Sequence, residues 1–182
     1  GNFISFIVKK YAYAKKVIID VVDIDNNVIE ILRLITSRLN IPQNIEINYI
    51  NDDFLLHKFT SRYDLVIGNP PFNKLGSNHK SLAIYKKQSY NTDTTNTFSF
   101  FLEKALQISD YVSLIVPKFL LNTPEFRKTR ELLEHKRIDS IIDLGEKGFK
   151  GVLVETICIS VNTVEQPSCT LVRSITENKL LI

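Results

Sequence analysis

The sequence has no methionine and few residues of the kinds that bind metals. Because it has no methionine and begins Gly1-Asn2-Phe3, we expect a fragment or a trimmed product. Its two cysteines and three histidines lack the spacing of a metal site, which predicts a reduced, metal-free protein. No charged-then-apolar leader opens the chain, and no apolar run approaches the roughly 20 residues that span a bilayer. These absences predict a soluble, cytoplasmic protein without a membrane partner.

Charge and size set the next limits. Lys and Arg number 23 against 20 for Asp and Glu, so the net charge of +3 is only mildly basic. Any surface for nucleic acid must therefore be local. The 182 residues, 44% of them hydrophobic, are enough for a substantial core. We expect one domain over residues 1–182.

Strand-like and helix-like patterns alternate along the chain. The β-branched run 17–22, the alternating run 45–50 and the buried run 65–67 predict strands, and helical spacing of apolar residues fills 28–39. This βαβ order favours an α/β fold with a mostly parallel sheet. The polar tract 74–97 is longer than most connections, which predicts a mobile loop.

The second half continues the alternation and then changes. A helix at 98–108 and a strand at 112–116 precede three further predicted strands at 138–144, 155–161 and 169–173. The glycine-rich stretch GEKGFKG joins the first two of these three. Such a join suits an antiparallel hairpin, which we place at a sheet edge.

Asn69-Pro70-Pro71-Phe72 follows the third predicted strand and needs a chemical explanation. A conjugated amine is a poor nucleophile because its lone pair is delocalised. The Asn69 side-chain oxygen and the Pro70 carbonyl oxygen could accept its two N–H bonds and free the lone pair, while Phe72 stacks on the ring. The alternative is a plain Asn-Pro turn with Phe72 as a core residue.

Acidic residues follow the first two predicted strands. Asp23 is placed to accept hydrogen bonds from the ribose of a nucleoside cofactor, with Ile24 against its adenine. Asp53 and Phe54 form a similar pair after the next strand. The Asp53 carboxylate could accept a hydrogen bond from the amino group of the cofactor adenine, and Phe54 is the aromatic residue beside it. Each acid taken alone is more often a solvated turn residue, and Asp25 could instead cap a helix.

Six stretches together resemble a known family: Gly1-Asn2-Phe3, VVDID, NDDFLL, YDLVIGNPPFNK, YVSLIVPKFLL and IIDLGEKGF. Across nearly the whole chain they resemble the catalytic domain of DNA adenine amino-methyltransferases of bacterial restriction-modification systems. The resemblance implies a Rossmann-like fold that uses S-adenosylmethionine. It also implies that the first strand, most of a glycine-rich loop and a target-recognition domain are missing, so the fragment alone need not be active.

The resemblance assigns roles to individual residues. It implies that Gly1, Asn2 and Phe3 are the tail of the loop that holds the methionine part of the cofactor. Asp23, Ile24, Asp53 and Phe54 would hold its nucleoside part. Asn69, Pro70, Pro71 and Phe72 would be the catalytic tetrapeptide that holds the target adenine.

The implied substrate is double-stranded DNA with a flipped adenine, and an endonuclease would be fused or separate. Phe149 resembles an aromatic residue that contacts the flipped base, or else it covers the core from a hairpin. Lys74, with Lys80, Lys86 and Lys87, could meet phosphates, although a run of charges is usually a solvated face.

Three other functions stay open from the sequence. Similar tetrapeptides occur in methyltransferases of ribosomal RNA guanine and of release-factor glutamine. A binding module without cofactor is the third. The long polar tract after Lys74 and the segments LIVPKFLL and IIDLGEKGF favour the DNA enzyme.

Overall fold

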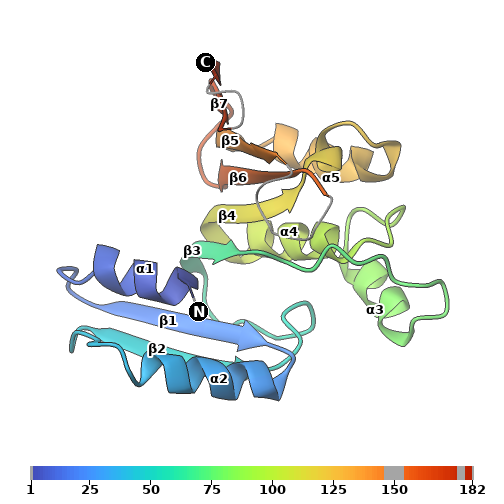
Figure 1. Cartoon of the computed structure of the whole chain (residues 1–182). Coiled ribbons are helices and arrows are strands. Elements are labelled where there is room, and N and C mark those ends of the chain that lie inside the picture. The colour runs from blue at the N-terminus through green and yellow to red at the C-terminus, as the bar shows by residue number, and fades with distance from the viewer. Residues whose placement is uncertain (1, 146–153, 176–178, 182) are drawn as a thin grey trace. The chain divides into compact units, whose positions relative to one another are not determined.

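The computed structural model describes residues 2–145, 154–175 and 179–181. They form two compact units, residues 1–58 and residues 59–182, which are described separately (Figure 1). Within these described ranges, no helix is long and apolar enough to cross a membrane.

The first unit is a two-stranded parallel sheet with two helices. Its elements are α1 (Asn2–Lys10), β1 (Val17–Asp23), α2 (Asn26–Thr36) and β2 (Ile45–Asn51). The register runs from Val17 opposite Ile45 to Asp23 opposite Asn51. Ile4 and Val8 of α1 are buried in one cluster with Leu32 of α2, and α1 runs alongside β1 (Figure 1). The apolar pattern thus predicted β1, α2 and β2 closely.

The second unit is built on a six-stranded sheet in the order β3-β4-β6-β5-β7-β8. Its strands are β3 (Tyr63–Gly68), β4 (Ser109–Pro117), β5 (Arg137–Gly145), β6 (Thr156–Asn162), β7 (Leu171–Ser174) and β8 (Lys179–Leu181). Its helical segments are α3 (Lys80–Gln88), α4 (Thr97–Ile108), η1 (Lys118–Leu121), η2 (Pro124–Phe126) and α5 (Arg127–Glu134).

The expectation of a mostly parallel sheet is matched only in part. β3 pairs with β4 and β5 with β7 in parallel, whereas β4–β6, β5–β6 and β7–β8 are antiparallel. The predicted antiparallel pairing of β5 with β6 is confirmed, but it lies inside the sheet and not at its edge. β7 pairs on the far side of β5, and β8 then follows it.

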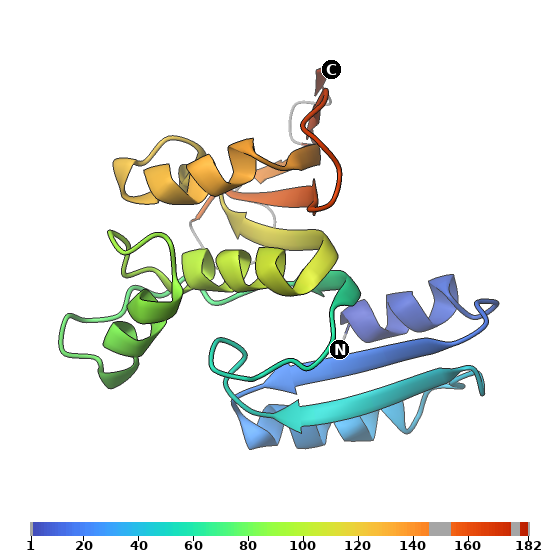
Figure 2. The same cartoon turned by 180° about the vertical axis from the view of Figure 1, so that it is seen from behind.

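The core of the second unit lies between the sheet and helices α4 and α5, which cover the same face (Figure 2). Phe98 of α4 is fully buried and contacts the rings of Phe119 and Phe126 at centroid distances of 5.9 and 4.9 Å. Burying one such side chain stabilises a fold by about 1.5–3 kcal/mol. This packing holds the end of β3 against a rigid core.

The tract 74–97, expected as a loop, contains helix α3 and a set of buried polar residues. The pattern of α3 was too weak to predict, since only Leu82 and Tyr85 are buried. Asn91, Thr94 and Asn96 are almost completely buried. The side chains of Asn91 and Thr94 bond to other polar groups, and the Asn96 backbone N–H donates to the Thr94 hydroxyl. The mobility of this tract stays a prediction.

Candidate functional site

The carboxyl end of β1 carries the first candidate residues. The Asp23 carboxylate accepts a hydrogen bond from the Asp25 backbone N–H at 2.9 Å, and no described residue bonds its second oxygen. The Asp25 carboxylate caps α2, since it accepts from the Asn27 N–H at 2.8 Å. Asp25 is therefore the capping residue of α2, and one carboxylate oxygen of Asp23 is left to accept a hydrogen bond from a ligand.

Asn51, opposite Asp23 at the end of β2, fixes the turn beside it. Its side-chain N–H₂ donates to the carbonyl oxygens of Asp23 and Ile24 at 3.1 and 3.0 Å. The Ile24 side chain stays 70% exposed. The strand ends thus present a carboxylate and an apolar side chain together.

The turn after β2 contains the second predicted pair. The Asp53 carboxylate accepts from the Leu55 N–H at 2.9 Å, so one of its oxygens shapes the turn, and Phe54 is half-buried beside it. The neighbouring Asp52 carboxylate lies 2.7 Å from the His57 ring nitrogen. This hydrogen bond, with a smaller one from the Asp53 N–H, lowers the pKa of Asp52. No local pattern in the sequence predicts that pair.

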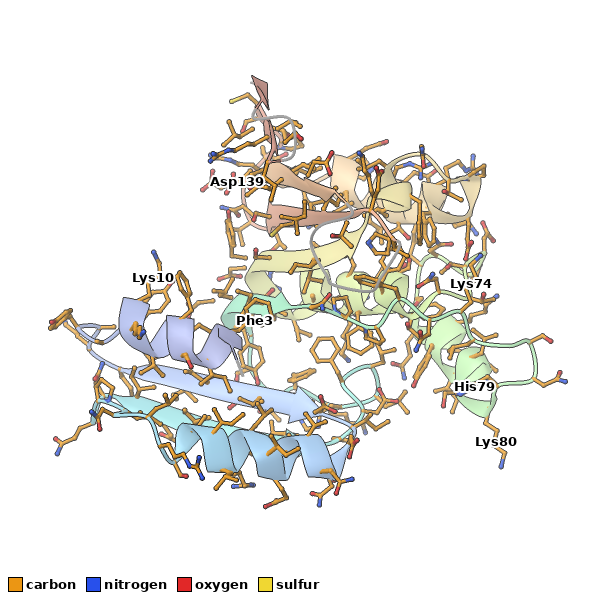
Figure 3. All side chains as sticks on the ribbon, viewed as in Figure 1. Phe3, Lys10, Lys74, His79, Lys80 and Asp139 are labelled. Carbon is orange, nitrogen blue, oxygen red and sulfur yellow. The ribbon has the colours of Figure 1, made fainter. Side chains whose placement is uncertain are left out.

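Two of the three residues matched to the glycine-rich loop, Asn2 and Phe3, open helix α1. Gly1 lies outside the described residues, Asn2 begins the helix, and Phe3 is partly exposed in its first turn (Figure 3). Their predicted contact with a cofactor stays a prediction.

The tetrapeptide directly follows β3. Asn69 and Pro71 are exposed, Pro70 is buried and Phe72 is half-buried. Among the described residues, neither the Asn69 side chain nor the Pro70 carbonyl oxygen has a hydrogen-bond partner. The Phe72 ring meets Phe98 edge to face, with ring centroids 6.4 Å apart. Two acceptors are therefore unused, next to an aromatic ring that the core anchors.

The chain leaving the tetrapeptide is tied to the start of α4. The Thr97 hydroxyl lies 2.6 Å from the Pro71 carbonyl oxygen and 3.1 Å from that of Asn73. The Thr97 N–H also donates to the Asn73 carbonyl oxygen at 2.9 Å, and the Leu75 N–H to that of Thr95 at 2.9 Å. No sequence signal marks Thr97, because this contact depends on the tertiary fold.

Lys74 is paired within the protein. Its ammonium lies 2.9 Å from a carboxylate oxygen of Glu125, whose other oxygen accepts from the Thr94 hydroxyl at 2.9 Å. Burial acts to raise the pKa of Glu125, but the hydrogen bonds from Lys74 and Thr94 outweigh it and lower the pKa. A contact of Lys74 with substrate would have to compete with this pair.

The other lysines of the tract lie on α3. Lys80 and Lys87 are exposed, and the described structure gives neither an acidic partner. Figure 3 shows Lys80 pointing away from the rest of its helix. Both side chains are therefore open to a phosphate.

A buried carboxylate supports the segment between α3 and α4. Glu103 is only 2% exposed and accepts from the backbone N–H groups of Tyr90 and Asn91 at 2.7 and 3.1 Å. Burial raises the pKa of Glu103 although these bonds act against it. The Asn91 side chain then donates to the Thr129 hydroxyl at 2.8 Å. It also donates to the Glu125 carbonyl oxygen at 2.9 Å, so the network reaches the residue that pairs with Lys74.

Comparison with known families decides what the chain is. Residues 4–149, more than half of the chain, match the family described as Eco57I restriction-modification methylase. The chain belongs to the Eco57I restriction-modification methylase family. A search of curated proteins finds no match.

Solved structures show the same fold at low sequence identity. A protein from Listeria monocytogenes described as a class I S-adenosylmethionine-dependent methyltransferase is 17% identical, with a TM-score of 0.71, over 96% of this chain and 64% of that one. A modification subunit from Vibrio vulnificus, described as part of a type I restriction enzyme, is 14% identical, with a TM-score of 0.68, over 86% and 34%.

A third similar structure is a type I restriction-modification methyltransferase subunit from Streptococcus thermophilus. It is 12% identical, with a TM-score of 0.66, over 97% of this chain and 48% of that subunit. The chain thus spans less than two thirds of each of these three proteins. It has the α/β fold of S-adenosylmethionine-dependent methyltransferases, with a mixed sheet.

The last two predictions for this member of the Eco57I family concern Phe149 and the absence of a metal ion. Phe149 lies outside the described residues, so its contact with a flipped base stays a prediction. Across the part of the chain that the structure describes, no three His, Cys, Asp or Glu residues form a group that could hold a metal ion.

Proposed function

We propose that this protein transfers a methyl group from S-adenosylmethionine to the exocyclic amino group of adenine in DNA, as the modification part of a restriction-modification system. One observation carries the proposal. At the end of β3 in a methyltransferase fold, the Asn69 side chain and the Pro70 carbonyl oxygen are acceptors without a partner among the described residues. Membership of the Eco57I family supports the restriction-modification setting.

The two acceptors suit a planar amino group. Hydrogen bonds from its two N–H groups to the Asn69 side chain and the Pro70 carbonyl oxygen would draw the nitrogen towards tetrahedral geometry. The lone pair would then be localised on the nitrogen and no longer shared with the ring. Such electrostatic help is effective because the acceptors are already fixed in place. Proline rings at 70 and 71 lock two backbone torsions, and stacking of a base on Phe72 would add about 1–3 kcal/mol.

The residues at the end of β1 fit a nucleoside cofactor. Asp23 has an unused carboxylate oxygen for a ribose hydroxyl, and the exposed Ile24 side chain offers an apolar surface for adenine. When bound, S-adenosylmethionine would supply a methyl group from a positively charged sulfur and leave as S-adenosylhomocysteine, while the methylated amino group would lose one proton to solvent. Asp53 and Phe54 would complete the nucleoside site, and Gly1, Asn2 and Phe3 would lie near the methionine part.

Reaching the amino group requires that adenine leave the duplex, since that group is otherwise paired. Lys80 and Lys87 would contact the phosphates of the flanking strand, and Lys74 would do so only by giving up Glu125. Phe149 would contact the flipped base. A cognate endonuclease, fused or separate, is the proposed partner.

In the test, labelled S-adenosylmethionine is given to the full-length protein together with unmethylated duplex DNA, ribosomal RNA and a release factor. Label on the adenine amino group is the expected result. Asn69→Ala should lower the transfer rate about 100-fold or more, because it removes one of the two prepositioned acceptors. Asn40→Ala, which removes an exposed amide ahead of β2, should leave the rate within twofold.

Three outcomes would revise the proposal. Label on guanine or on glutamine would leave the proposed role of Asn69 in place but show that the substrate is not adenine. No label on any acceptor would favour a binding module. A transfer rate for Asn69→Ala within a few-fold of the wild-type rate would contradict the proposed mechanism, in which Asn69 localises the lone pair of the amino nitrogen.

A further inference from the structure

Thr97 makes a contact that the proposed mechanism does not yet use. It is the first residue of α4 and is 7% exposed. Its hydroxyl donates to the Pro71 carbonyl oxygen at 2.6 Å and lies 3.1 Å from that of Asn73, on the other side of Phe72. It does not touch the two acceptors of the proposed site. Thr97 therefore holds the tetrapeptide while leaving Asn69 and Pro70 open.

The backbone of the tetrapeptide has few soft torsions. Each proline fixes its own φ near −65°, and a residue that precedes proline is restricted to extended conformations. Asn69 and Pro70 both precede a proline. The first freely adjustable torsion is then ψ of Pro71, which sets the direction of the Pro71 carbonyl. The Thr97 hydroxyl bonds that carbonyl at 2.6 Å.

The hydroxyl has no competing task in its own helix. A threonine near a helix start commonly bonds the exposed backbone N–H groups there. Here the preceding residue, Asn96, makes no side-chain capping bond, and no other described residue bonds its buried side-chain oxygen. The Thr97 side chain instead reaches out of the helix to the tetrapeptide, and helix α4 that carries it is packed into the core.

We propose that Thr97 is a positioning residue for methyl transfer. Its hydroxyl fixes ψ of Pro71, and so sets where Phe72 lies relative to Asn69 and the Pro70 carbonyl. The inference rests on the proposed function for its effect on the rate. Its effect on the backbone does not depend on which substrate is methylated.

The test compares three variants of the full-length enzyme. Thr97→Val keeps the shape of the side chain and removes the hydroxyl, and Thr97→Ser restores the hydroxyl. Thr129→Val is the matched control, because Thr129 is also a buried threonine in a hydrogen-bond network, bonded to Asn91 and Ser99, but does not touch the tetrapeptide.

We expect Thr97→Val to lower kcat about tenfold to 100-fold, as small misplacements of reacting groups do. The affinity for S-adenosylmethionine should be unchanged, and the loss of thermal midpoint should equal that of Thr129→Val. Thr97→Ser should recover most of kcat. Amide exchange over residues 72–75 should become faster in Thr97→Val alone.

A kcat for Thr97→Val equal to that of Thr129→Val would overturn the inference, as would a loss that Thr97→Ser does not recover. If the wild-type protein methylates none of the offered acceptors, the proposed function fails by itself. Amide exchange over residues 72–75 then decides the inference, and equal exchange in Thr97→Val and the wild type would overturn it.

Discussion

The two sheet ends that carry the candidate residues are supported in different ways. In the first unit, exposed hydrogen bonds hold the end of β1, among them Asp25 N–H to Asp23 and Asn51 to the Ile24 carbonyl. In the second, partly buried bonds from Thr97 hold the tetrapeptide, and the almost completely buried Glu103 holds the chain at Tyr90 and Asn91. Exposed hydrogen bonds thus hold the end of β1, whereas partly or fully buried hydrogen bonds hold the segments that follow β3.

The difference teaches where each unit tolerates change. An exposed hydrogen bond exchanges readily with water, so its loss costs little. A buried donor without a partner costs about 1–3 kcal/mol, because water cannot replace the lost bond. The second unit should therefore be sensitive to single deletions around the tetrapeptide. The first should tolerate them and respond chiefly in ligand affinity.

The largest effect is expected at Glu103. Glu103→Ala leaves the N–H groups of Tyr90 and Asn91 without an acceptor, so the free energy of unfolding should fall by about 2–4 kcal/mol. Urea denaturation followed by circular dichroism measures it. Glu103→Gln keeps the volume and one acceptor oxygen, so it should cost less. A loss of less than about 0.5 kcal/mol in the free energy of unfolding of Glu103→Ala would contradict the expectation that the second unit is the more sensitive to single deletions.

A smaller effect, on binding, is expected at Asp23. Asp23→Asn should weaken S-adenosylmethionine binding about tenfold, because a hydrogen bond to a charged acceptor is worth about 1.5–3 kcal/mol. Stability should change by less than about 0.5 kcal/mol, as at other surface sites. Calorimetric titration of the full-length protein measures the affinity.

Asp25→Asn is the control for Asp23. It removes the same charge two residues away and keeps an N-cap side chain that α2 accepts equally well. Equal losses of affinity in both variants would point to general charge and not to a ribose contact at Asp23.

Local sequence patterns predicted much of the fold. The runs 17–22 and 45–50 became β1 and β2 with one residue added to each, because β-branched residues favour strands and the pattern is local. The order of strands was not predictable in the same way. Both β5 and β6 were expected, yet their place inside the sheet depends on β7 pairing with β5, which no local pattern encodes.

The candidate site divides along the same line. Asn69, Asp23 and their neighbours could be proposed from the sequence because each stands at the end of a strand or directly after it, and the sequence displays strand ends. Thr97 and Glu103 were not found. Glu103 lies in FLEKAL, where it resembles the charged position of an ordinary exposed helix turn. Only the fold reveals that the N–H groups of Tyr90 and Asn91 surround its carboxylate.

The smallest predicted effect is a difference in pH dependence between the units. The pKa of Asp52 is lowered by its bond to His57, so its contribution to stability is present above its ordinary pKa of 3.8 and disappears as the pH falls through the folded-state value. The pKa of Glu103 is raised by burial. Its ionised form therefore opposes folding, and this penalty disappears as the pH falls towards its ordinary value of 4.5.

The two carboxylates should thus give pH profiles of opposite sign. Thermal midpoints of the wild type, Asp52→Asn and Glu103→Gln between pH 3 and 7 measure them. As the pH falls, the wild type should lose its advantage over Asp52→Asn and gain relative to Glu103→Gln. Profiles of the same sign would mean that the buried carboxylate is not penalised, and that both units hold their acids as surface groups do.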